Sequence, residues 1–483
     1  MNAAEFRTYG HQLVDWIAEY LEHSDRYPVL SPNAPGDIVR ALPSQAPDDP
    51  EPFTRIFEDF ERLLVPGLTH WNHPGFMAYF AITASAPGIL GELLSAALNQ
   101  QAMLWRTSPA STELEQVALN WLRQLLGLPE DFEGVIYDTA SISTMHALTA
   151  AREVTVPGVR TQGLAGRDLP RYRIYCSDQA HSSVDKAVIA IGLGHDTLRR
   201  VASDDRFQLD VQALDAAIAA DRATGIVPMA VVATIGTTST TSVDPLRAIA
   251  TLCQREGVWL HVDAAYAGVA AMLPTHRAIL DGVELADSLV VNPHKWLFTP
   301  FDVSTFFCRR MDVVRTAFSL TPDYLKTTEG DAGAVKNLMD TGVQLGRRFR
   351  SLKLWMVMRS FGASGLRREI ARHIDLAQQL AAWVDAHPDF VRVAPAPFSV
   401  VCFRWAPAGL DPERLDLLNA RLLDAVNASG EVFISQTKLR GRYVIRVAIG
   451  HERTTIEHVR RAWELLQQHA REIQESVPPA QPR

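Results

Sequence analysis

The sequence has few cysteines, and their positions exclude two kinds of structure. Four occur in 483 residues, and they form no CxxC pair and no zinc-binding spacing: Cys176, Cys253, Cys308 and Cys402. This pattern excludes a disulfide-rich secreted scaffold and a zinc-finger module. We expect free thiols in a reducing compartment, and therefore a cytoplasmic protein.

Long apolar runs and basic clusters are also missing. No apolar stretch approaches the length of a membrane span, and acidic residues interrupt the N-terminal MNAAEFRTYGHQLVDWIAEYLEH, which does not have the pattern of a signal peptide. A net charge of −8 without a run of lysine or arginine disfavours a nucleic-acid-binding surface. We therefore expect neither a nucleic-acid partner nor a membrane partner.

Two common phosphate-binding motifs are absent as well. The chain contains no GxxxxGK[ST], and Gly192 and Gly194 lack the third glycine of GxGxxG. Both absences disfavour an ATP-binding or nicotinamide-binding protein. The hydrophobic fraction of 47% and charged fraction of 21% are those of an ordinary globular protein.

The N-terminal region has a helical pattern interrupted by proline. Apolar residues recur at helical spacing over residues 2–24, a Pro-rich stretch over 27–52 should be extended, and a second helix is expected over 53–65. Two helices joined in this way cannot cover each other's apolar faces alone, so we expect them to lie on another subunit. The aromatic-rich loop 71–80 lines either a core or a pocket.

Short apolar runs then alternate with helical segments. A helix is expected from Ser108 to Gly127. Strands are expected at 134–137, 172–176, 229–234, 258–262, 287–291 and 303–307, and helices at 141–153, 182–191, 211–221 and 245–256. This alternation predicts an α/β fold with a mostly parallel sheet that has helices on both faces and binds ligands at the carboxyl ends of its strands.

From about residue 365 the pattern changes. It predicts a long helix, strands at 398–405, 431–436 and 443–449, and a closing helix near 454–473. We therefore expect three parts: an N-terminal helical dimerisation segment (1–85), a large α/β domain (86–360) and a small C-terminal α+β domain (361–483).

A lysine in the stretch 286–298 is unusual. The apolar strand Leu289-Val-Val leads through Asn292-Pro-His to Lys295, and the apolar Trp296-Leu-Phe follows at once. Burial at such a place lowers the pKa of an ammonium group and leaves a nucleophilic amine that can form a Schiff base. The alternative is a structural lysine that extends from a strand end to solvent.

Three other strand ends carry polar groups. Thr139-Ala140-Ser141 follows a strand and opens a helix, which is either ordinary N-capping or an anion site suited to a phosphate. Asp263 ends an apolar strand before small residues, where a carboxylate needs a cationic partner. A metal site of His261, Asp263 and His294 is the weaker alternative.

The last of these strand ends carries His181, in Asp178-Gln-Ala-His181. It is either a cap or surface residue, or, near a cofactor, a ring that stacks on it. A phosphate site, a buried acid and a desolvated lysine on successive strand ends together suit pyridoxal phosphate.

The sequence resembles the aromatic-L-amino-acid decarboxylase family, group II of the pyridoxal-phosphate-dependent decarboxylases of fold type I. The resemblance covers nearly the whole chain and rests on long stretches: MNAAEFR, THW, SPASTELE, SDQAHSS, HVDAAYAG, NPHKW and LGRRFRSLKLW. It implies a seven-stranded sheet, pyridoxal 5'-phosphate as cofactor and a homodimer with shared active sites. Glutamate and histidine decarboxylases share the lysine and aspartate, but the aromatic-family stretches are closer.

The resemblance assigns roles by position. Lys295 corresponds to the Schiff-base lysine, Asp263 to the partner of the pyridine nitrogen and His181 to the residue that stacks on the ring. Tyr324 corresponds to the mobile-loop tyrosine that reprotonates Cα in the neighbouring subunit's site. Further cofactor contacts match Ala140, Ser141 and Asn292, with Thr139, Thr238, Ala265 and His294 beside them.

The implied reaction is the decarboxylation of tryptophan, tyrosine, phenylalanine, DOPA or 5-hydroxytryptophan to the arylalkylamine and CO2 through a Lys295 aldimine. We expect the substrate to contact Trp71, Tyr79, Phe80, Ile82, Met103, His181 and Gly346. Ile82 departs from a threonine that is common in the family, Gln101 and Met103 depart from apolar and aromatic residues, and Gly346 favours an indole or a broad aromatic range.

Two alternatives remain. An aromatic aldehyde synthase would decarboxylate and then oxidatively deaminate, and the retained His181 and Tyr324 argue against it. A non-catalytic binding protein on a decayed enzyme fold would not need the complete set of cofactor residues that the chain carries.

Overall fold

Buried apolar runs form a seven-stranded sheet in the computed structural model, which describes residues 1–320, 325, 327–331 and 333–476. Its order is β2-β8-β7-β6-β5-β3-β4, and β8 is antiparallel to both neighbours while the other strands share one direction. The strands are β2 (Glu133–Tyr137), β3 (Tyr172–Ser177), β4 (Leu198–Val201), β5 (Val227–Thr234), β6 (Trp259–Asp263), β7 (Ser288–Val291) and β8 (Ser304–Cys308). The mostly parallel seven-stranded sheet is confirmed.

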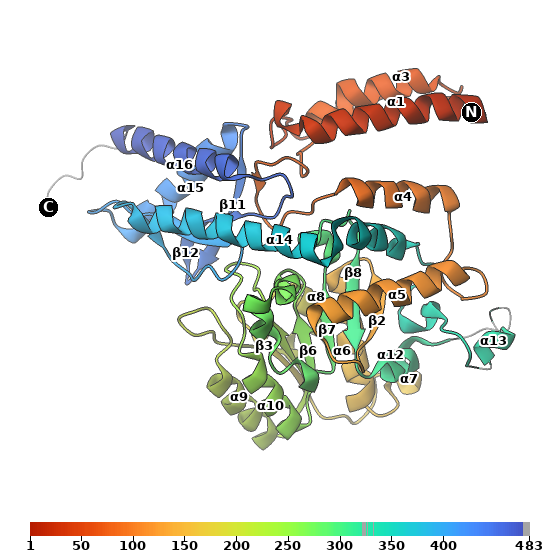
Figure 1. Ribbon diagram of the computed structural model, residues 1–483. Coiled ribbons are helices and arrows are strands. Elements are labelled where there is room, and N and C mark those ends of the chain that lie inside the picture. Colours follow the sequence, from red (N-terminus) through yellow and green to blue (C-terminus); the bar gives the residue numbers. More distant parts are fainter. Residues whose placement is uncertain (321–324, 326, 332, 477–483) are drawn as a thin grey trace. The chain divides into compact units, whose positions relative to one another are not determined.

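Helices connect these strands from both faces (Figure 1). The connections from β2 through α6 (Ala140–Thr155) to β3, and through α8 (Ser183–Ala190) to β4, run one way along the sheet. Those through α9 (Val211–Ala223) to β5 and α10 (Leu246–Glu256) to β6 run back. Because parallel crossovers are right-handed, the reversal puts the two pairs of helices on opposite faces.

A buried cluster holds one of these faces together. Ala147, Leu148 and Ala151 of α6 and Val184 and Val188 of α8 pack with apolar residues of the sheet and of α12 (Met311–Phe318). Ala147 and Leu148 lie four and three residues before Ala151, and Val184 lies four before Val188, as expected for one buried stripe on each helix. This packing fixes the first turns of α6 and α8 over the carboxyl ends of β2 and β3.

The described chain forms two compact units. The larger, Ile82–Ala377 with Ala394–Val401, contains the seven-stranded sheet together with α4 (Ala86–Leu98) and α5 (Pro109–Leu126). The other comprises Met1–Ala81, Gln378–Val393 and the described part of Cys402–Arg483. The helix α14 (Arg350–Ala386), bent at Gly362, has residues in both units. Our division into 1–85, 86–360 and 361–483 stays a prediction about the functional parts of the chain.

The smaller unit has a five-stranded sheet of its own. Its order is β1-β11-β12-β10-β9, with strands β1 (Phe76–Met77), β9 (Phe390–Arg392), β10 (Val400–Trp405), β11 (Phe433–Leu439) and β12 (Arg442–Ala448). The helices α15 (Pro412–Ala428) and α16 (Ile456–Ser476) pack together, and α15 packs on β11 and β12. The short β1 pairs in parallel with β11, which joins the N-terminal region to the C-terminal sheet.

The two N-terminal helices contact each other through aromatic rings. Trp16 of α1 (Ala3–Glu22) has its ring centroid 6.2 Å from Phe57 of α3 (Phe53–Asp59) and 5.3 Å from Phe60. Even so, α1 buries none of its residues, and Phe6 and Val14 remain exposed. The two helices therefore leave apolar surface uncovered, as the sequence indicated. Among the described helices, none is long and apolar enough to cross a membrane.

Candidate active site

The polar groups predicted from the sequence arrive at one edge of the seven-stranded sheet. His181 follows β3, Asp263 ends β6 and Lys295 follows β7. Thr139 follows β2, and Thr238 follows β5. All five strands run in the same direction, so their carboxyl ends lie at the same edge.

A chain of hydrogen bonds joins Asp263 to Lys295. The carboxylate oxygen Oδ1 of Asp263 accepts the backbone N–H of Ala265 at 3.1 Å. The carbonyl of Ala265 accepts the N–H of Asn292 at 3.0 Å, and the carbonyl of Asn292 accepts the N–H of Lys295 at 2.9 Å. The turns after β6 and β7 therefore form one hydrogen-bonded piece.

Asp263 is buried, whereas Lys295 is half-buried. Within the sheet, Asp263 pairs with Thr234 of β5 and Val290 of β7, and the following Ala264 and Ala265 are small and buried. A carboxylate at such a place is costly unless a cationic group faces it. This geometry favours a site for a group that carries positive charge beside Asp263.

His181 lies within electrostatic reach of both residues. Partial burial of the ring lowers the pKa of His181, although much of the residue is exposed; the Asp263 charge raises this pKa and the Lys295 charge lowers it. The ring nitrogen Nδ1 accepts the backbone N–H of Ser183 at 3.0 Å, at the start of α8. The histidine thus caps a helix, as the plainer interpretation held, and also lies near the lysine and the aspartate. Its neutral ring carries the proton on Nε2.

The turn before α6 does not use its threonine as a cap. The side chain of Thr139 makes no capping hydrogen bond; its hydroxyl and its backbone N–H instead donate to Asp138 Oδ1, at 3.2 and 2.6 Å. Ser141 in the first turn is exposed. Capping by Thr139 is therefore not what the structure shows, and the first turn of a 16-residue helix faces this edge of the sheet.

The loop that carries Thr238 is held tightly. Gly236 has φ +89°, and a Cβ atom added there would lie 2.5 Å from Cβ of Ala267, so another residue would collide with the turn after Asp263. Hydroxyls of Thr237, Thr240 and Ser242 bond to one another at 3.0 and 2.8 Å. Thr238 itself is exposed on this fixed loop.

His294 and Asn292 are buried beside Lys295. His294 Nδ1 accepts the N–H of Val303 at 2.9 Å, and burial lowers the pKa of His294 to about 3, with a smaller contribution from the Lys295 charge. Asn292 Oδ1 is buried and has no hydrogen-bond partner among the described residues. Among all the residues that the structure describes, no three His, Cys, Asp or Glu side chains lie close enough to hold a metal ion.

The predicted substrate contacts fall into separate groups. Ile82, Met103 and Gly346 belong to the larger unit, and Trp71, Tyr79 and Phe80 to the smaller one. Trp71 and Tyr79 stack at 5.9 Å between ring centroids, and the guanidinium of Arg446 lies over Phe80. Tyr324 lies outside the described residues.

Gly346 and the segment of Met103 do lie side by side. The N–H of Arg347 donates to Gln101 Oε1 at 2.8 Å, and the carbonyl of Arg347 accepts the N–H of Ala102 at 2.9 Å. A Cβ atom added at Gly346 would lie 3.3 Å from Gln101 Nε2. Gln101 and Met103, which depart from the residues common in the family, therefore lie in the segment that is hydrogen-bonded to the turn at Gly346 and Arg347.

A buried ion pair that the sequence did not reveal holds Arg347, next to Gly346, in place. Arg347 and Glu115 are 2.7 Å apart, with side chains 7% and 2% exposed. Glu115 accepts the N–H of Ile136 at 2.8 Å, and Arg347 donates to the carbonyl of Ile136 at 2.8 Å. Both groups thereby hold β2 just before Thr139. SPASTELE and LGRRFR contain these residues, but a charged residue in sequence gives no sign that it will be buried.

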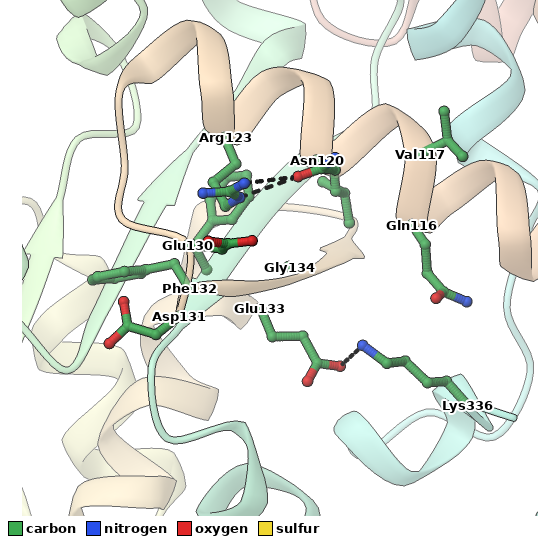
Figure 2. A pocket seen from close by; sticks show the side chains of 12 residues that line it. Gln116, Val117, Asn120, Arg123, Glu130, Asp131, Phe132, Glu133, Gly134 and Lys336 are labelled. Atoms are coloured by element: carbon green, nitrogen blue, oxygen red, sulfur yellow. Dashed lines mark hydrogen bonds and ion pairs between the residues drawn. The ribbon is translucent and has the colours of Figure 1, made fainter. Parts of the chain in front are cut away.

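A hollow lies at the opposite edge of the sheet. It has a volume of about 570 Å³, and Figure 2 shows Glu133 and Lys336 pairing within it, with Arg123 and Asn120 bonded nearby. Its walls include Glu133 and Gly134 at the amino end of β2. None of the predicted site residues lines it.

The family model described as "Pyridoxal-dependent decarboxylase conserved domain" matches residues 35–406. The chain belongs to the pyridoxal-dependent decarboxylase family. The family accounts for a lysine, a buried aspartate and a helix start at one edge of a fold type I sheet, and the cofactor is pyridoxal phosphate. The predictions of family, fold class and cofactor are confirmed.

Named relatives of this decarboxylase differ in their reactions. Over 478 residues it is 40% identical to a phenylacetaldehyde synthase of Arabidopsis thaliana (97% of this chain, 96% of that protein) and 40% identical to tyrosine decarboxylase 2 of Narcissus pseudonarcissus (97% and 95%). A solved structure titled Oryza sativa TDC with PLP and tryptamine superposes with a TM-score of 0.95 at 37% identity, covering 98% of this chain and 99% of that one.

The residues of this edge fit pyridoxal phosphate. The cofactor has an aldehyde for an amine, a pyridine nitrogen for a carboxylate, and a phosphate for a helix start with free N–H groups. Lys295, Asp263 and the first turn of α6 offer these three groups. The buried Asn292 Oδ1, which lacks a partner among the described residues, is a further acceptor here.

Proposed function

We propose that this decarboxylase converts an aromatic L-amino acid to the arylalkylamine and CO2, with pyridoxal phosphate held on Lys295. The observation that carries the proposal is the hydrogen-bonded link from Asp263 through Ala265 and Asn292 to Lys295. Relatives of high coverage named as tyrosine and tryptophan decarboxylases support an aromatic side chain in the substrate.

Each residue has a distinct task in this proposal. The Lys295 amine would hold the cofactor through its aldehyde, and the Asp263 carboxylate would face the pyridine nitrogen and favour its protonated form. The first turn of α6, with Thr139, Ala140 and Ser141, holds the phosphate. Bound pyridoxal phosphate supplies the electron sink for the pair of electrons left by the departing CO2.

Other residues contact the face of the cofactor ring or supply the proton that Cα takes up. The neutral ring of His181 stacks on the cofactor, with Nε2–H available to the substrate, and Thr238, Ala265, Asn292 and His294 complete the cofactor pocket. Tyr324 donates the proton that Cα takes up after CO2 leaves, from one subunit into the site of the other. The imidazole of His181 is suited to this place because its lowered pKa keeps it uncharged near neutral pH.

We expect Gly346 to bear on the choice of substrate. A Cβ atom there would lie only 3.3 Å from Gln101 Nε2, and the absence of a side chain at this position supports tryptophan or a broad range of aromatic amino acids, as the family resemblance implies. Ile82 and Met103 would add apolar surface, and Trp71, Tyr79 and Phe80 would add aromatic surface. We expect aromatic substrates to be preferred over histidine and glutamate.

A decarboxylation panel tests the proposal. The purified protein, loaded with pyridoxal phosphate, is assayed with tryptophan, tyrosine, phenylalanine, DOPA, 5-hydroxytryptophan, histidine and glutamate, and amine and CO2 are measured. We expect one amine per CO2 from at least one aromatic substrate. Borohydride should trap the cofactor on Lys295. Turnover of glutamate or histidine alone would overturn the aromatic assignment.

An aromatic aldehyde synthase is the second candidate, and the 40% identity to a phenylacetaldehyde synthase favours it. That reaction consumes one O2 and one water per amino acid and yields aldehyde, CO2, ammonia and hydrogen peroxide. Peroxide equal to CO2 would establish this activity in place of the decarboxylase.

We also expect Tyr324→Phe to divert the decarboxylase toward aldehyde, since the proton donor for Cα is lost. Unchanged amine production by this variant would contradict the role of Tyr324.

We further propose a cytoplasmic homodimer with shared sites. Leu90, Leu93, Leu94 and Leu98 of α4 are exposed, and so are Phe6 and Val14 of α1, so both helices present apolar surface that a second copy could cover. Four buried free cysteines suit a reducing compartment. Sedimentation of the holoenzyme should give twice the chain mass of 53.5 kDa; a monomer that remains fully active would contradict the shared site.

A further inference from the structure

Two large buried rings directly follow the residues of the active site. Trp296 comes after Lys295, and Tyr266 comes after Ala265, whose N–H donates to Asp263. The two rings stack with centroids 4.8 Å apart and planes 6° from parallel, and both residues are at most 2% exposed. The stack thus joins the turn that carries the lysine to the turn after the aspartate.

Each ring is fixed at its polar atom. The indole Nε1–H of Trp296 donates to Nδ1 of His373 on α14 at 3.0 Å, and the hydroxyl of Tyr266 hydrogen-bonds to that of Ser399. His373 and Ser399 are fully buried. A buried donor that loses its partner is unfavourable, so each ring is restricted to an orientation that keeps its bond.

The rings do more than fill the core. Purely apolar side chains could pack a core without a buried donor that must be satisfied, and buried Trp and Tyr are suited only to places where a partner is in reach. Here the partners come from α14 and from the segment before β10, far from β6 and β7 in the chain. The stack therefore ties the two catalytic turns to a part of the unit that does not itself carry catalytic groups.

We propose that Trp296 and Tyr266, held by His373 and Ser399, are positioning residues that set the orientation of Lys295 relative to Asp263. The inference rests on the proposed function, because it matters only if both residues hold the cofactor. Lys295 is held through its backbone on one side by Asn292 and on the other by the stacked indole. Misplacement by about 1 Å of a catalytic group costs up to about 10²-fold in rate.

Four variants of the holoenzyme test the proposal. Trp296→Phe keeps a ring but removes the N–H, and His373→Leu removes the acceptor. His373→Gln keeps an acceptor, and Tyr266→Phe removes only the hydroxyl. Each is compared by visible circular dichroism of the bound cofactor without substrate, and by separate kcat and KM values. Trp405→Phe, at a buried tryptophan of the smaller unit, controls for loss of core volume.

We expect Trp296→Phe and His373→Leu each to lower kcat about tenfold and to change the visible dichroism, with KM within about twofold. His373→Gln should behave like the parent, and the double variant Trp296→Phe/His373→Leu should lose no more than either single one. Trp405→Phe should alter neither readout. If a His373 variant does not fold, Tyr266→Phe provides the comparison through the other ring.

Parent-like dichroism and kcat in Trp296→Phe and His373→Leu would overturn the proposal. Equal losses in His373→Gln and His373→Leu would overturn it too, because packing alone would then explain them. The dichroism is recorded without substrate, so it judges the ring stack even if the aromatic substrate panel fails. Failure of the proposed function appears instead in the parent protein, as absent turnover of every aromatic amino acid.

Discussion

The backbone N–H of Asn292 donates to the carbonyl of Ala265 at 3.0 Å, across the gap between the turns that follow β6 and β7. Ala265 is two positions after Asp263, and Asn292 is three positions before Lys295. The bond fixes the separation of the two turns that carry the carboxylate and the lysine. Such pre-set geometry is what a site needs if it is to hold both ends of one flat ring.

Replacing Lys295 should remove turnover. In Lys295→Ala the amine that holds the cofactor is absent, so we expect kcat to fall by at least about 10⁴-fold. Amine release from the best aromatic substrate measures this loss. The exposed lysine of α8 offers a matched control, since Lys186→Ala should stay within about twofold of the parent. Residual activity above a tenth of the parent in Lys295→Ala would exclude a covalent role.

Asp263→Asn should separate charge from shape. The amide oxygen can still accept the N–H of Ala265, so the turn keeps its hydrogen bond while the negative charge is lost. We expect kcat to fall by about 10²–10³-fold with little change in thermal stability. The pKa of His181 should fall further, because the Asp263 charge raises it. Asp215→Asn on the exposed side of α9 is the control, and parent-like kcat in Asp263→Asn would refute the charge requirement.

The buried pair of Glu115 and Arg347 should matter for stability. Glu115→Leu leaves a buried guanidinium without its partner, which costs about 3–5 kcal/mol in free energy of unfolding. Glu115→Leu/Arg347→Met should lose less than the sum of the single changes, because no charge is left unpaired. Urea unfolding measures both. The exposed pair of Asp385 and Arg392 is the control, where Asp385→Asn should cost less than about 1 kcal/mol; additive losses at the buried pair would show that the two residues act independently.

Acid should weaken the fold through its buried histidines. Burial lowers the pKa of His294 to about 3, below its value of 6.5 when exposed, so the unfolded chain takes up a proton below pH 6.5 that the folded chain refuses. The free energy of unfolding is therefore highest above pH 6.5 and decreases as the pH falls toward 3. One such group lowers it by about 1.4 kcal/mol between pH 7.5 and pH 5.5. His294→Gln should unfold in urea with a correspondingly smaller dependence on pH, and an equal dependence would assign the effect to other groups.

The sequence predicted the elements that have a strong local pattern. The buried strands β5, β6 and β7 are nearly continuous apolar runs, and all three were expected close to their observed bounds. The strand β4 was missed because Leu198-Arg-Arg-Val has two charged residues in four. The helix α15 was also missed, and α14 begins at Arg350 rather than near 365.

The sequence points to candidate site residues where a charge falls in an apolar context. Lys295 and Asp263 were proposed because each interrupts apolar sequence at a strand end. Glu115 with Arg347 and Tyr266 with Trp296 were not found, since their pairing depends on the register of distant elements, which one sequence does not contain. The sequence left N-capping by Thr139 open as an alternative. It gave no sign that Thr139 would bond to Asp138 instead.

The four cysteines have a practical consequence. All are buried, and burial raises the pKa of the Cys176 and Cys308 thiols to about 12 and that of Cys402 to about 11. Because thiolates and not thiols react with maleimides and nitroxide reagents, the native protein should remain unlabelled under mild conditions. A single cysteine introduced at an exposed position such as Leu320 would then carry the only spin or fluorescent label. Distances from that label could be followed during turnover without first removing any native residue.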